Sequence, residues 1–421
     1  MRNERRAALR LGPGLITGAC NDDPGSVGTY SQIGAQFGFA LAWTLLFSFP
    51  LLVAIQEIGA RLARVTGRGI AGNLRQHCPR WLAAFLITTL CAANVFNLAA
   101  DLGAMGAVLR LLLAAPALLF VCLLGAVTVA FEMLTHYARY LRFLRWLSLS
   151  LLSYVACAFV VAVPWKQFAQ ALLWPPLVAS PQYALAVVAA LGTTVSPYLM
   201  FWQAQLEVED GAHQERAPRL LEAPEHAARE FARIRLDTLV GMGLSGMVAL
   251  FIVITTASTL HTHGVVTIQT AAEAAEALRA VGGRFTFVLF ALGIIGSGLL
   301  TLPALSNSAA YAVGELLSWR VGRRRPPGGA RAFYAAIALA TMLAVALNFA
   351  SINPMRALYW SAVLNGVIAV PLMAAVMSLA TQAHVMGPLR LPAGLRALGW
   401  AATATMAASV ACLAASWLVF S

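Results

Sequence analysis

Charge is scarce in this sequence of 421 residues, where Asp, Glu, Lys and Arg together make up 11% and hydrophobic residues make up 60%. A typical soluble domain contains about 25% charged residues, so the composition excludes a soluble protein. Apolar stretches of about twenty residues recur along the whole length, and each can cross the roughly 30 Å hydrocarbon core of a bilayer. The sequence therefore predicts an all-α integral membrane protein with one transmembrane domain, residues 1–421.

Patterned cysteines and catalytic motifs are also missing. The six cysteines form no CxxC pair and fall mostly inside apolar stretches, which excludes a disulfide framework or zinc site of the usual spacing. There is no HExxH motif, no Ser/His/Asp set and no phosphate-binding loop, so we expect neither an enzyme nor a resident cofactor. No cleavable signal peptide is expected, because a charged N-terminus precedes an apolar segment that contains two aspartates.

Lysine is almost absent, since 28 of the 29 basic residues are arginine, and these arginines lie in alternate loops. We predict eleven spans, at 12–37, 39–63, 82–110, 115–133, 142–164, 183–206, 236–259, 285–316, 332–350, 357–381 and 398–419. With a cytoplasmic N-terminus, 24 basic residues fall inside and 5 outside. The protein is therefore expected in the cell (inner) membrane. The positive-inside rule then places the N-terminus on the cytoplasmic side and the C-terminus on the outer side. The net charge of +12 thus indicates membrane orientation rather than a nucleic-acid partner.

Two of the predicted spans contain helix-breaking residues at mid-depth. The first is interrupted at Asp23-Pro24-Gly25 and the sixth over Leu191–Tyr198. Proline removes a backbone donor and glycine tolerates unusual backbone angles. Two broken helices in corresponding positions predict a five-plus-five inverted repeat, with a binding site where the breaks meet. Repeat one would cover about 11–164, repeat two about 183–381, and an extra helix about 398–419.

Asp23 is the strongest candidate for binding a cation. A charged group at the bilayer centre costs about 2.5–3.5 kcal/mol on insertion scales, so it is rarely present without a function. The Asp23 carboxylate would act together with the backbone carbonyls of Cys20 and Thr193 and the hydroxyls of Ser26 and Ser196. The alternative is that Asp23 only caps the second half of the broken helix.

Five further polar residues are predicted to lie around this site or along the ion pathway: Asp22, Asp101, Tyr198, Asn365 and Glu57. Asp22 would point to a different side from Asp23 and form part of a gate or vestibule. For Glu57 the alternative is an ion pair with Arg61, one helical turn away. For Asn365 the alternative is a hydrogen bond between helices.

Several motifs resemble the Nramp family of divalent-metal transporters. They are Gly12-Pro13-Gly14, Asp23-Pro24-Gly25, the stretch IGAQFG at 33–38, and QEIGARL at 56–62 followed by VTGRG at 65–69. The similarity is densest in the first hundred residues and around 190–206. The resemblance implies a LeuT-like core and import of a divalent metal ion by alternating access. The expected partners are the divalent metal ion and the lipid bilayer. A monomeric state is compatible with this interpretation.

The sequence departs from the family pattern at four positions. Ser26 stands where the family has Asn, Ser196 where it has Met, Tyr198 where it has His, and Ala104 where it has a second acid after Asp101. Without the Met sulfur the ligands are all oxygens, which suits a hard ion. This pattern resembles the magnesium-transporting branch related to Nramp, in which Mg²⁺ keeps part of its hydration shell.

The same departures bear on coupling. With Tyr198 and Asp101 alone, we expect uptake without protons, because 100 mV supplies roughly 4.6 kcal/mol for a divalent ion. We therefore predict import of partly hydrated Mg²⁺, with Mn²⁺ tolerated. One alternative is a proton-coupled Mn²⁺ or Fe²⁺ importer. A less favoured one is a sodium-coupled organic-solute symporter, whose carboxylate substrate Asp23 would repel.

Overall fold

The computed structural model describes residues 12–176, 180–213, 220–268, 270–323, 327–350 and 354–420. The elements assigned in these segments are all helices. Some residues used in the sequence predictions are not among those described. They are the predicted start of repeat one at residue 11 and eight of the arginines counted for the topology, at 2, 5, 6, 10, 216, 219, 324 and 325. The described part of the chain contains ten helices that are long and apolar enough to cross a membrane. The one predicted span missing from these ten is the first, at 12–37. Its helix is broken into halves of 7 and 14 residues, each too short to be counted alone.

The spanning helices follow the predicted order along the chain. They are α2 (Pro13–Ala19) with α3 (Pro24–Phe37), α4 (Ala42–Thr66), α6 (Arg80–Leu113), α7 (Ala117–Leu134), α8 (Tyr137–Leu147) with α9 (Leu152–Val160), α11 (Pro181–Thr194) with α12 (Pro197–His213), α13 (Ala227–Thr259), α14 (Ala271–Leu316), α15 (Arg331–Phe349), α16 (Pro354–Thr381) and α18 (Ala393–Phe420). The predicted all-α fold is confirmed. The assignment of these helices to two inverted repeats stays a prediction.

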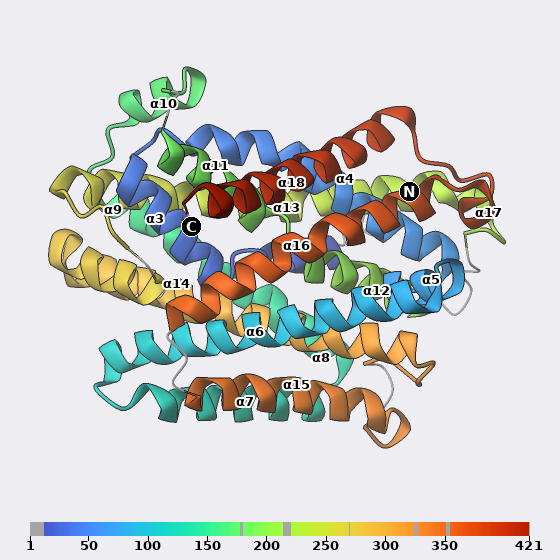
Figure 1. Ribbon diagram of the computed structural model, residues 1–421. Helices are drawn as coiled ribbons and strands as arrows, with labels where there is room; N and C mark the ends of the chain where they lie inside the picture. The colour runs from blue at the N-terminus through green and yellow to red at the C-terminus, as the bar shows by residue number, and fades with distance from the viewer. Residues whose placement is uncertain are drawn as a thin grey trace, which may run out of the picture.

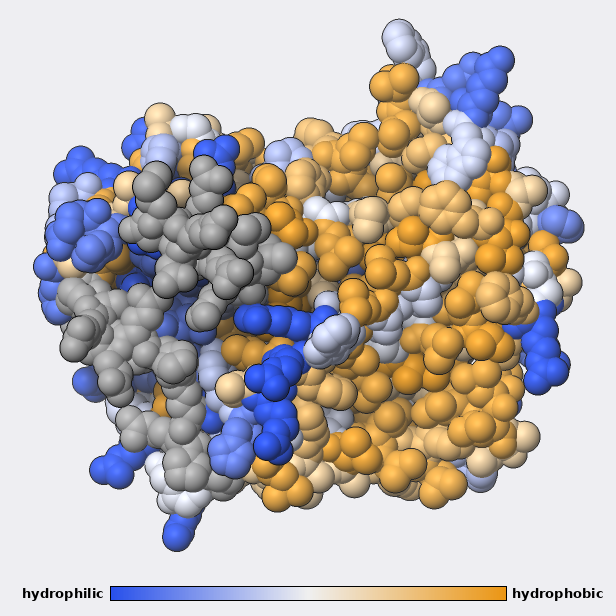
Figure 2. Space-filling model, turned by 180° about the vertical axis from the view of Figure 1, so that it is seen from behind, coloured by the Kyte–Doolittle hydropathy of each residue, from blue (hydrophilic) through white to orange (hydrophobic). Residues whose placement is uncertain are grey.

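Short helices mark the two ends of the bundle. In Figure 1, α5 (Ile70–His77) and α17 (Ala383–Met386) lie at one end, and α10 (Trp165–Leu173) lies at the other. The predicted topology requires this arrangement, because it places the connections that contain α5 and α17 on the same side of the membrane. Apolar side chains cover much of the face in Figure 2, and polar side chains gather toward the ends. Such a surface suits a lipid environment.

The first half-helix, α2, is packed tightly against α13. A Cβ atom added at Gly18 would lie 2.1 Å from the backbone carbonyl of Gly241, so the two backbones are in contact there. The N-terminus of α2 is capped by a residue from α13. Asp237 accepts hydrogen bonds from the backbone N–H groups of Gly12 (2.9 Å), Gly14 (2.7 Å) and Leu15 (3.1 Å). These are N–H groups that a helix start leaves without an intrahelical partner.

Four arginines of the charge count are paired with glutamates inside the bundle. The pairs are Arg61 with Glu57, Arg64 with Glu230 (3.4 Å), Arg233 with Glu207, and Arg323 with Glu132 (3.4 Å). The Glu57–Arg61 pair is the alternative that the spacing of these residues allowed, and it is confirmed. Arg323 also lies over the ring of Tyr140, with its guanidinium carbon 3.9 Å from the ring centroid.

Candidate metal site

The first break lies between α2 and α3, at residues 20–23, so it overlaps the predicted Asp23-Pro24-Gly25 only at Asp23. Pro24 and Gly25 form the start of α3. Asp23 caps α3, because its Oδ1 accepts a hydrogen bond from the backbone N–H of Ser26 at 2.6 Å. The capping interaction is therefore real. Asp23 and Ser26 are both buried.

The second break lies between α11 and α12. Val195 follows the end of α11 in an extended conformation, and α12 begins at Pro197. Thr193 and Ser196 are half-buried. A Cβ atom added at Gly192 would meet no other atom within 4 Å, so there is open space beside the end of α11.

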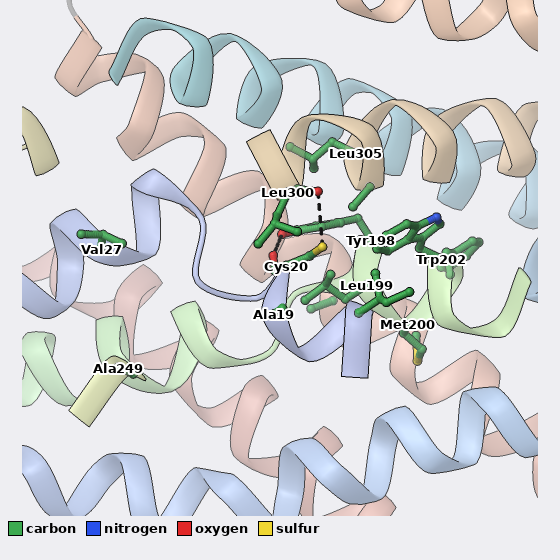
Figure 3. Packing of buried hydrophobic residues seen from close by; sticks show 14 of the residues in the cluster. Ala19, Cys20, Val27, Tyr198, Leu199, Met200, Trp202, Ala249, Leu300 and Leu305 are labelled. Carbon is green, nitrogen blue, oxygen red and sulfur yellow. Dashed lines mark hydrogen bonds between the residues drawn. The ribbon is translucent and has the colours of Figure 1, made fainter. Parts of the chain in front are cut away.

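A hydrogen bond links the two broken helices. The Tyr198 hydroxyl, in the first turn of α12, donates to the backbone carbonyl of Cys20 at 2.9 Å (Figure 3). The thiol of Cys20 points to another helix, where it donates a hydrogen bond to the carbonyl of Leu300 on α14 at 3.3 Å. Because the thiol is engaged with α14, the atom that Cys20 offers to the region between the breaks is an oxygen.

Three buried carboxylates lie in or beside this region. Asp22 accepts a hydrogen bond from Ser245 of α13 at 3.1 Å. Asp101, on α6, is fully buried and lies near enough to Asp23, the Thr301 hydroxyl and the backbone N–H of Gly25 to interact with them. The Oδ2 atoms of Asp22 and Asp101 are buried without a hydrogen-bond partner among the described residues. None of the ion pairs between described residues includes these three aspartates. Buried carboxylates without a counter-charge are unfavourable, so the region favours a cation.

The structure places two of the predicted surrounding residues in contact with other side chains. Asp22 is fully buried and accepts a hydrogen bond from Ser245 of α13, and its role in a gate or vestibule stays a prediction. Glu57 lies toward the α5 end of α4, where its carboxylate is paired with Arg61, and its place on the ion pathway stays a prediction. Asn365 is half-buried on α16, and its Oδ1 is buried without a hydrogen-bond partner in the described part of the chain.

Sequence reasoning missed the partners that hold the first break in place. Asp237 and Ser245 come from α13, and the carbonyl of Leu300 comes from α14. These contacts join residues more than 200 positions apart, and no local pattern signals them. No group of three or more His, Cys, Asp or Glu side chains that could hold a metal ion was found among the described residues. Backbone carbonyls, hydroxyls and water would therefore have to complete the coordination of any ion at Asp23.

The fold defines the class of protein, a helical membrane protein with the LeuT fold. The transporter Mhp1, of the nucleobase-cation-symport-1 family, matches with a TM-score of 0.54 at 14% identity, covering 96% of this chain and 92% of its own. A Na⁺-coupled sialic acid symporter matches with a TM-score of 0.57 at 10% identity, covering 93% and 88%. At such low identity these likenesses show the fold alone.

Within this class the chain belongs to the Nramp family. The family described as natural resistance-associated macrophage protein-like matches residues 14–416. A manganese transporter of Eremococcus coleocola shares the fold with a TM-score of 0.73 at 16% identity, covering 96% of this chain and 85% of its own. A "Divalent metal cation transporter MntH" of Verminephrobacter eiseniae is 28% identical over 382 residues, 86% of this chain and 83% of that protein. The MntH protein of Pectobacterium carotovorum is 27% identical over 307 residues, 71% and 70%.

Proposed function

We propose that this protein moves a divalent metal cation across the membrane by alternating access, with the ion held between the two helix breaks. The observation that carries the proposal is the meeting of the breaks through Tyr198 and Cys20, next to buried carboxylates that form no ion pair within the described chain. The names of the MntH relatives, and of the manganese transporter with the same fold, support the same substrate class.

The proposed ligands are those expected from the sequence. Asp23 supplies the anionic oxygen, Cys20 and Thr193 supply backbone carbonyls, and Ser26 and Ser196 supply hydroxyls directly or through water. Carboxylate, carbonyl and water oxygens suit Mg²⁺, Ca²⁺ and Mn²⁺. The Asp23 cap on α3 is compatible with this role, because a carboxylate has two oxygens and about four acceptor positions.

Mn²⁺ is the first candidate ion, because the related proteins are named for manganese or for divalent metals in general. Mg²⁺, the ion expected from the sequence, is the second candidate. One observation favours it: the Cys20 thiol is engaged with α14, so it offers no soft sulfur ligand to the region between the breaks. Mg²⁺ usually retains several waters and binds through one or two carboxylates. We therefore propose a site that discriminates only weakly between Mn²⁺ and Mg²⁺.

Coupling to protons depends on Asp101, the acid beside Asp23. If Asp101 releases a proton as the ion arrives, transport is proton-coupled, as in the alternative considered above. If it does not, the membrane potential drives uptake alone. Uptake without protons stays our prediction. The N-terminus is proposed to be cytoplasmic on the strength of the loop charges.

Reconstituted vesicles test this proposal. Mn²⁺ uptake is measured under an inside-negative potential, with Mg²⁺, Ca²⁺ and Cd²⁺ as competitors, a pH dye inside, and protein-free vesicles as the control. We expect saturable Mn²⁺ uptake, strong competition by Mg²⁺, no requirement for Na⁺ and no internal acidification. Acidification that follows metal entry would establish proton coupling. Failure of both Mn²⁺ and Mg²⁺ to enter would contradict the proposed function.

A further inference from the structure

Tyr198 makes a contact that no motif predicts. Its hydroxyl donates to the Cys20 carbonyl at 2.9 Å, and both residues are fully buried. Cys20 is the residue at which α2 ends, where backbone carbonyls have no intrahelical partner. The tyrosine therefore satisfies an oxygen that the helix end leaves open (Figure 3).

The hydrogen bond directs the Tyr198 hydroxyl at the Cys20 carbonyl, which is one of the oxygens proposed to bind the ion. The charges of Asp23, Asp101 and Asp22 also act on Tyr198.

We propose that Tyr198 is a positioning residue that controls how available the Cys20 carbonyl is to the transported ion, and thereby sets the affinity for that ion. The inference rests on the proposed function. A carbonyl that accepts a hydrogen bond is satisfied without an ion, whereas a buried carbonyl without a partner is unfavourable. An ion that takes this oxygen must share it with the hydroxyl or displace it. Removing the hydroxyl then favours the ion-bound form.

Tyr30 offers a matched control. It is a fully buried tyrosine on α3 that also interacts with the charges of Asp22 and Asp23. Its hydroxyl has no hydrogen-bond partner among the described residues. Tyr30→Phe therefore removes the same atom close to the same acids without changing the Cys20 carbonyl.

The experiment compares wild type, Tyr198→Phe and Tyr30→Phe in the full-length protein. The dissociation constants for Mn²⁺ and for Mg²⁺ are measured by calorimetry, and KM and kcat for Mn²⁺ uptake are measured in vesicles. We expect Tyr198→Phe to bind both ions more tightly, by about fivefold or more, because a satisfied acceptor has been left open. Its KM should fall, and its kcat should fall as well because ion release is slower. Tyr30→Phe should match wild type.

Each other outcome contradicts the inference in a distinct way. If the affinity of Tyr198→Phe for the ions is unchanged, the hydrogen bond has only a structural role, in holding α2 and α12 together. Weaker binding would make the hydroxyl a ligand itself. If Tyr198→Phe does not fold, Tyr198→Leu replaces it, because an apolar side chain without a hydroxyl also leaves the carbonyl open. A wild type that binds neither Mn²⁺ nor Mg²⁺ would overturn the proposed function together with this inference.

Discussion

The two helix breaks differ in how firmly the structure holds them. The first is buried from Cys20 to Pro24, and the half-helix before it is in backbone contact with α13 and is capped by Asp237. The second is half-buried at Val195 and Ser196, and open space lies beside Gly192. The first break contains Asp22 and Asp23, whereas the second offers only neutral oxygens.

This difference suggests a division of roles between the breaks. A charged ligand needs a fixed position, because its desolvation cost is recovered only with good geometry. Neutral hydroxyls and carbonyls cost less to desolvate than a carboxylate, so the second break does not need packing as tight as that around the first. The predictions below test whether rigidity and charge at the first break, and space and neutrality at the second, are what distinguish them.

The largest effect is expected at Gly18. Gly18→Ala places a Cβ atom 2.1 Å from the backbone of Gly241, where no flexible side chain can yield. Overpacking costs about 1–3 kcal/mol even where side chains can adjust, so a backbone clash should cost more. We expect little folded protein, measured as monodisperse yield in detergent. A normal yield and melting temperature would show that α2 is not tightly packed on α13.

Asp23→Asn separates charge from capping, because asparagine caps helices as well as aspartate does. We expect the variant to fold normally and to lose Mn²⁺ uptake by more than about a hundredfold, beyond the 10–100-fold typical of residues that only support a metal ligand. Melting temperature and vesicle uptake are the two measurements. Uptake close to that of wild type would leave Asp23 as a cap alone.

Ser196→Met introduces a thioether sulfur at the second break. Soft sulfur ligands favour softer metals over Mg²⁺, so the preference for Cd²⁺ over Mg²⁺ should rise by about tenfold. Competition against Mn²⁺ uptake measures this ratio, and Ser196→Ala controls for loss of the hydroxyl. If both variants keep the wild-type ratio, Ser196 does not contribute to the site.

The smallest effect is expected at Gly192, near the end of α11. A Cβ atom has room there, and alanine favours the helix by roughly 0.5–1 kcal/mol over glycine. Gly192→Ala should therefore leave folding intact and raise the melting temperature slightly. A fall as large as that of Gly18→Ala would mean that the two half-helices are packed equally tightly, and the contrast between the breaks would disappear.

Much of this architecture could be predicted from the sequence, because its signals are local. Apolar length predicted the spans, Pro24 and Gly25 predicted the first break, and the four-residue spacing of Glu57 and Arg61 allowed their ion pair. The assignment of ligands at Asp23 stays a prediction.

The contacts that shape the site could not be predicted in this way. The Tyr198–Cys20 and Asp237–Gly14 hydrogen bonds join distant segments, and their geometry exists only once the helices have packed. The depth at which Asp22 is buried likewise depends on α13, which contributes Ser245.

The arginines that pair with glutamates inside the bundle matter both during membrane insertion and in the folded protein. During insertion, a basic loop is retained on one side of the bilayer, and this decides which way the chain threads. After folding, Arg61, Arg64, Arg233 and Arg323 no longer present that charge freely to lipid, because each is bound to a glutamate. Losing one of them would therefore weaken the packing of the folded bundle, whereas the predicted orientation would still be favoured by the remaining loop arginines.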